Sequence, residues 1–125
     1  RRMIREMLLA GAGGFAGSVL RYAVSVFAVP WSLQSGFPVG TFAVNAAGSF
    51  LIGLSAALLP AGGWQTFAMA GFCGGFTTFS AFSLEAVRMV RGGAYGAAAA
   101  YAAGSVAVCL FFAGVGLWLG AKLSR

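Results

Sequence analysis

Apolar residues fill most of the chain, and short polar or Gly- and Pro-containing segments divide them into four runs. The dividing segments lie at about residues 30–38, 60–63 and 88–93. Each run has the length of a membrane-spanning helix, which needs about 20 predominantly apolar residues. The pattern predicts four such helices, at about residues 4–28, 39–59, 65–88 and 94–121. We therefore expect residues 1–125 to form a single all-α transmembrane domain.

Charged residues are nearly absent from these runs. None lies between Arg21 and Glu85 or between Arg91 and Lys122. Over the whole chain, 60% of residues are hydrophobic and only 8% are charged, which is too little charge to cover the surface of a soluble protein. Tryptophans fall near predicted helix ends, as interfacial aromatic residues do: Trp31, Trp64 and Trp118. The composition supports a multi-pass membrane protein.

The side-chain inventory excludes most catalytic chemistry. The chain has no His and no Asp, and its two side-chain carboxylates belong to Glu6 and Glu85. These absences remove Ser-His-Asp triads, paired-carboxylate hydrolysis and His-containing metal sites. Cys73 and Cys109 lie inside apolar runs, where a free thiol behaves as a small hydrophobic group. We therefore do not expect an enzyme.

The charged residues give only a weak orientation signal. The net charge of +6 resides at helix ends without an aromatic-interleaved stripe, so lipid headgroups explain it better than nucleic-acid binding. With four spans, the basic residues divide five to three between the two sides: Arg1, Arg2, Arg5, Lys122 and Arg125 against Arg21, Arg88 and Arg91. Such a chain could insert in both orientations. Because four helices are few to enclose a hydrophilic path, an antiparallel pair of copies satisfies both observations, although neither requires it.

The third predicted helix has an unusual centre. Residues 71–83 read GFCGGFTTFSAFS, which is a poor sequence for an uninterrupted helix. The Gly74-Gly75 pair followed by Thr77-Thr78 predicts a local opening, which would free backbone groups to line a cavity or coordinate a cation. The alternative is that these small residues only allow close packing against neighbouring helices.

Other candidate residues have two interpretations each. Asn45 lies in the middle of the second helix, where its amide either bonds a neighbouring helix or lines a polar path. Phe79 and Phe82 share one helix face, either as core residues or as rings whose positive edges face an anion. Arg21 stands near the far end of the first helix, where it either snorkels to headgroups or attracts anions to a vestibule.

The fourth helix carries a stripe of polar side chains, Tyr101, Ser105 and Cys109, at spacings of four residues. Their hydroxyl groups could supply donors along a path, or Ser105 could bond its own helix backbone. Glu85 and Arg88, three residues apart in the third helix, are expected to form an ordinary surface ion pair.

Three segments resemble the Fluc-type (CrcB) fluoride ion channels: GGFAGSVLRY (13–22), GTFAVNAAGSFLIG (40–53) and GFCGGFTTFSAFSLE (71–85). The resemblance covers nearly the whole chain, and the last motif is highly specific. It implies an antiparallel, dual-topology homodimer in the inner cell membrane, with two fluoride pores and a broken third helix. It also implies passive fluoride export and a structural sodium ion at the centre of the dimer.

The resemblance also assigns individual residues. Those matching the fluoride path are Asn45, Phe79, Phe82, Thr41, Tyr101, Ser105 and Arg21. Gly74 and Thr77 match the residues whose backbone carbonyls hold the sodium ion. Cys109 departs from the pattern, because a serine or threonine is expected there and a thiol is a weaker hydrogen-bond donor.

Two other functions fit a small four-span protein. A multidrug transporter of this size needs a carboxylate within the membrane, whereas Glu6 and Glu85 lie near helix ends. A non-transporting membrane subunit would carry a partner-facing patch of polar or small residues without a pore.

Overall fold

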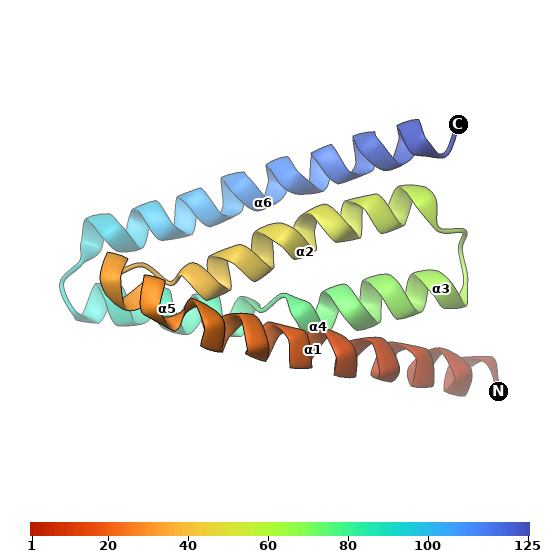
Figure 1. Ribbon diagram of the computed structural model, residues 1–125, viewed down its shortest axis with the longest axis horizontal. Helices are drawn as coiled ribbons and strands as arrows, with labels where there is room; N and C mark the ends of the chain where they lie inside the picture. The colour runs from red at the N-terminus through yellow and green to blue at the C-terminus, as the bar shows by residue number, and fades with distance from the viewer.

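The computed structural model describes residues 1–125 and contains only helices and short connections. The chain has four helical rods long enough to span a membrane. They lie side by side, with both termini at the same end of the bundle (Figure 1). Three rods are continuous: α1 (Arg2–Ser35), α2 (Val39–Leu58) and α6 (Tyr95–Leu123). The third rod consists of α3 (Gly63–Gln65), the π-helix η1 (Thr66–Cys73), α4 (Gly74–Phe76) and α5 (Phe79–Arg91). All four rods are long and apolar enough to cross a membrane, which confirms the predicted all-helical architecture.

The first helix runs beyond its predicted end. Pro30 and the polar residues after it indicated a loop, but α1 continues through Pro30 to Ser35. The helix ends instead at Gly36, which adopts the left-handed conformation (φ 72°) and donates its backbone N–H to the Ser32 carbonyl. Glycine occupies that conformation without strain, so a C-terminal glycine cap terminates the helix and the proline does not.

Glycines let the rods approach one another closely. α1 lies against η1 and α4, and α2 lies along α6. A Cβ atom added at Gly17 would come within 2.9 Å of the Phe76 backbone nitrogen, and one added at Gly116 within 2.8 Å of the Leu54 nitrogen. Neither position has room for a side chain, so small residues make these two helix contacts possible.

The third rod is interrupted inside the bundle (Figure 1). Thr77 and Thr78 adopt extended backbone, with φ/ψ angles of −91°/160° and −151°/114°, and helix resumes immediately afterwards. The predicted opening is therefore present, but Gly74 and Gly75 remain helical. A Cβ atom added at Gly75 would lie 3.0 Å from the Gly14 Cα atom. This glycine serves the contact with α1, and the two threonines form the break.

Asn45 of α2 pairs with the backbone that the break exposes. Its Oδ1 accepts a hydrogen bond from the Thr78 N–H at 2.8 Å, and its Nδ2 donates to the Thr78 carbonyl at 3.2 Å. The Thr78 hydroxyl also caps α5 by accepting from the Ala81 N–H at 3.1 Å. The interhelical hydrogen bond considered for Asn45 is therefore present. Because hydrocarbon offers no water, such partners let irregular backbone persist inside a membrane protein.

Replacing Asn45 with alanine should destabilise the fold. The Asn45→Ala variant leaves the N–H and C=O groups of Thr78 without these partners, and an unpaired buried group costs about 1–3 kcal/mol. The Ser49→Ala variant is the matched control, because the Ser49 hydroxyl bonds the Asn45 carbonyl of its own helix. We expect a lower midpoint of thermal unfolding in detergent micelles for Asn45→Ala than for Ser49→Ala. Equal midpoints would contradict the structural role of Asn45.

Candidate functional site

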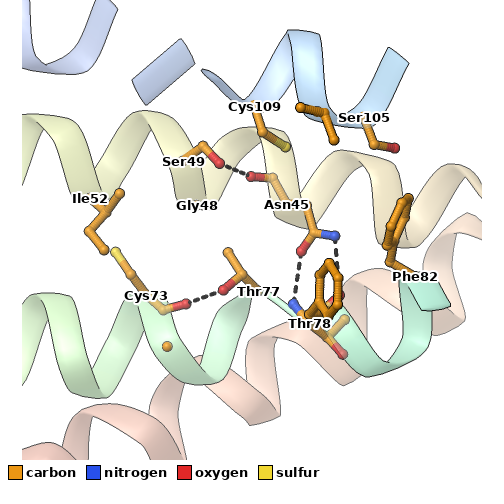
Figure 2. Close-up of a pocket in the computed structure, with 13 residues that line it drawn as sticks. Asn45, Gly48, Ser49, Ile52, Cys73, Thr77, Thr78, Phe82, Ser105 and Cys109 are labelled. Carbon is orange, nitrogen blue, oxygen red and sulfur yellow. Dashed lines mark hydrogen bonds between the residues drawn. The ribbon is translucent and has the colours of Figure 1, made fainter. Parts of the chain in front are cut away.

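A cavity of about 350 Å³ lies beside the break, between α2, the third rod and α6 (Figure 2). Four of its lining residues match the fluoride path of the resemblance: Asn45, Phe79, Phe82 and Ser105. Gly74 and Thr77, which match the sodium site, line it as well. The rest of the wall is formed by Gly48, Ser49, Ile52, Cys73, Thr78, Val106 and Cys109. The structure thus brings most of the predicted site residues to one place.

The polar groups of this cavity differ in what they bond. Ser49 Oγ donates to the Asn45 carbonyl at 2.7 Å, and Thr77 Oγ1 donates to the Cys73 carbonyl at 2.8 Å. Ser105 Oγ is buried without a hydrogen-bond partner in the protein, so the alternative bond to its own helix is not formed. The Asn45 amide carries two N–H groups, and Nδ2 makes one hydrogen bond, to the third rod. Two hydrogen-bond donors beside the cavity are therefore not used by the protein itself.

Phe79 and Phe82 lie together, as their spacing predicts. Their ring centroids are 5.6 Å apart with the planes inclined by 40°. Phe79 is 79% exposed, which rules out a role as a core residue within a single copy of the chain. Phe82 is half-buried, and its centroid lies 5.1 Å from that of Tyr101. The pair therefore presents aromatic surface to the cavity from the first turn of α5.

Glu85 binds two hydroxyl groups from other helices. The Thr41 hydroxyl donates to Oε2 and the Tyr101 hydroxyl donates to Oε1, both at 2.9 Å. Thr41 and Tyr101 are buried, with 7% and 0% of their surfaces exposed. The predicted ion pair between Glu85 and Arg88 was wrong, because the carboxylate turns toward these hydroxyls while Arg88 is exposed. Helical spacing reports neighbours on one helix only, so it missed partners supplied by α2 and α6.

A second cavity, of about 630 Å³, lies among the end of α1, the start of α2 and α5. Its polar lining residues are Ser25, Ser32, Thr41, Glu85 and Arg88. Tyr101 lies between the two cavities, because its ring contacts Phe82, which lines the first, and its hydroxyl bonds Glu85, which lines the second. Sequence reasoning missed this cavity, which depends on where α1 ends.

Arg21 lines neither cavity. Its Nε donates to the Gly75 carbonyl at 2.8 Å, and its side chain is partly buried beside α4. From the sequence, Arg21 was expected either to snorkel to lipid headgroups or to attract anions to a vestibule. Neither interpretation includes this hydrogen bond to the backbone of α4. Arg21 supports the last helical turn before the break.

Two carbonyls at the break are open to another ligand. The Thr78 N–H would bond the Gly74 carbonyl in a continuous helix, but it donates to Asn45 instead. The Thr77 carbonyl receives no hydrogen bond. Unwound backbone carbonyls are the groups that membrane proteins commonly offer to Na⁺, and no cluster of three or more Cys or Glu side chains forms elsewhere. The carbonyls of Gly74 and Thr77 therefore fit the sodium ion that the resemblance implies.

Comparison with known proteins gives a consistent result. The sequence profile described as CrcB-like protein, Camphor Resistance (CrcB), matches residues 8–117. The protein named Fluoride-specific ion channel FluC from Phenylobacterium zucineum is 49% identical over 120 residues, which covers 90% of this chain and 94% of that protein. The protein of the same name from Chlorobaculum tepidum is 49% identical over 118 residues, which covers 87% of this chain and 91% of that protein. The one from a strain of Thermus thermophilus is 45% identical over 124 residues, which covers 96% of this chain and 98% of that protein. The chain belongs to the CrcB family.

Proposed function

We propose that this protein is a fluoride-selective channel that exports fluoride passively across the inner cell membrane and so limits fluoride toxicity. The observation that carries the proposal is its similarity, over most of its length, to relatives named fluoride-specific ion channels. CrcB proteins form a channel family and not an enzyme family. This membership also sets aside the multidrug transporter and the non-transporting subunit considered from the sequence.

Fluoride is small and strongly hydrated, so a pore must replace its water with other donors. The cavity beside the break offers the Ser105 hydroxyl and one N–H of Asn45, neither of which has a partner in the protein. Because the bond between Asn45 and Thr78 holds the amide in place, the free N–H is already oriented before an anion arrives.

The two phenylalanine rings extend this set of donors. A ring edge carries partial positive charge and can face an anion, and Phe79 and Phe82 both line the cavity. Neutral dipoles and ring edges hold an anion less tightly than a fixed cation would, so fluoride can leave again. A constriction elsewhere along the path, too small for larger halides, would account for selectivity.

At the end of the first cavity the path passes Tyr101. A phenolic hydroxyl can rotate, so the Tyr101 O–H can donate to Glu85, as in the structure, or to an arriving fluoride. Glu85 retains the hydrogen bond from Thr41 when Tyr101 turns away. In the second cavity the exposed guanidinium of Arg88 raises the local concentration of anions.

The channel is proposed to be an antiparallel homodimer. A single copy leaves the Phe79 ring and Gly74 exposed beside an open cavity, and a second copy would cover them. The nearly balanced distribution of basic residues favours insertion in both orientations. The carbonyls of Gly74 and Thr77 from both copies would hold a structural sodium ion, whose charge would draw these carbonyl dipoles together.

Liposomes that contain only this purified protein should lose fluoride rapidly and chloride slowly, without ATP or a proton gradient. The Phe79→Ile and Phe82→Ile variants should slow fluoride efflux about tenfold, the effect of raising the barrier by roughly 1.4 kcal/mol. A fluoride electrode outside the liposomes measures both results.

Phe15→Ile is the control for these variants, because Phe15 is 74% exposed on α1 and lines neither cavity. No fluoride loss from liposomes with folded protein would overturn the channel. Normal efflux through both Phe79→Ile and Phe82→Ile would overturn only the proposed role of the rings and would leave the channel function standing.

Sodium should hold the two copies together. Native mass spectrometry in sodium-containing buffer should show a dimer that carries one sodium ion, and exchange of sodium for choline should increase the monomer fraction. The Asn45→Ala variant should weaken sodium retention, because Asn45 keeps the Thr78 N–H away from the Gly74 carbonyl. A monomer in both buffers, or a dimer unaffected by choline, would contradict the sodium site.

Insertion in both orientations predicts where the C-terminus lies. A tag placed there should be cleaved by protease added on either side of the membrane, in comparable fractions of the molecules.

A further inference from the structure

Two thiols line the cavity beside the break, and neither forms a disulfide. Cys73 is 2% exposed, whereas Cys109 is partly exposed. Cys109 replaces the serine or threonine that the resemblance leads us to expect, and its thiol makes no hydrogen bond. Of the two thiols, Cys109 is therefore the more accessible.

The neighbouring Ser105 has unused hydrogen-bonding capacity in this part of the cavity. Ser105 is 6% exposed and its hydroxyl, which lines the cavity, has no partner in the protein. Buried hydroxyl groups are nearly always hydrogen-bonded, so an unpartnered one points to a polar partner from outside this chain. Cys109 lies four residues further along α6, on the same face of the helix. A polar solute that reaches Ser105 is therefore next to the Cys109 thiol.

We propose that Cys109 is a covalent modification site at which small, polar disulfides and thiosulfonates close the ion path. The Cys109 thiol loses its proton to water, and the thiolate attacks one sulfur of the reagent. A new bond forms between Cys109 Sγ and that sulfur, the original sulfur–sulfur bond breaks, and the other half departs with the electron pair. A free thiol reverses the exchange and regenerates Cys109.

The position of the adduct explains why it would block ions. Figure 2 shows Cys109 projecting from α6 toward the part of α2 that carries Asn45, and both residues line the cavity. A group added to Sγ would occupy part of this cavity, which Asn45 and Ser105, the two residues with unused donors, also line. The effect on flux rests on the proposed channel function, but the reactivity of Cys109 does not.

The test uses the purified protein in liposomes and sulfonatoethyl methanethiosulfonate, a small anionic thiol reagent. Its reaction with Cys109 forms a mixed disulfide and releases methanesulfinate. We expect intact mass measurement to show one adduct per chain, and peptide mass spectrometry to place it on Cys109 and not on Cys73. Fluoride efflux should fall about tenfold, equivalent to roughly 1.4 kcal/mol at the barrier, and dithiothreitol should restore it.

Each cysteine variant is compared with its own untreated rate. Cys109→Ser should conduct equally with and without reagent, whereas Cys73→Ser should be inhibited like the original protein. An unmodified Cys109, or inhibition that persists in Cys109→Ser, would overturn the proposal. Modification of Cys109 without loss of flux would show that this site does not close the path. Absence of efflux before any reagent is added would instead count against the channel function, and the adduct mass would still decide whether Cys109 is the reactive thiol.

Discussion

The paired hydrogen bonds between Asn45 and Thr78 are the interaction on which the rest of the structure depends. A membrane interior has no water to solvate backbone groups, so a helix cannot open there unless other protein groups replace the lost bonds. Asn45 supplies an acceptor for the N–H and a donor for the C=O from the adjacent helix. The third rod can therefore pass from helix to extended backbone and back within the bundle.

The same interaction decides which polar groups stay available for ions. With the Thr78 N–H engaged by Asn45, the Gly74 carbonyl loses its helical donor, and the Thr77 carbonyl has none. One N–H of Asn45 and the hydroxyl of Ser105 are left beside the cavity as donors. A chain with few charges thereby acquires acceptors suited to a cation and donors suited to an anion around a single break.

Hydropathy and residue type predicted the four spans and the interrupted third helix, whereas the family resemblance placed Asn45 and Ser105 on one path. Predictions failed where another local signal or a contact between helices overrides the pattern. Pro30 indicated a loop, yet the helix continues to a glycine cap. Helical spacing predicted an ion pair between Glu85 and Arg88, but the hydrogen-bond partners of Glu85 come from other helices. The π-helix before the break has no signature in the residue pattern, and whether the Ser105 hydroxyl is bonded depends on three-dimensional contacts alone.

Backbone chemical shifts measured by solid-state NMR on the protein in lipid bilayers test the central claim most directly. Thr77 and Thr78 should show the shifts of extended backbone, flanked on both sides by helical shifts, and the side-chain amide of Asn45 should show a through-space contact to the Thr78 amide proton. Uninterrupted helical shifts through both threonines, with Asn45 remote from them, would contradict the account.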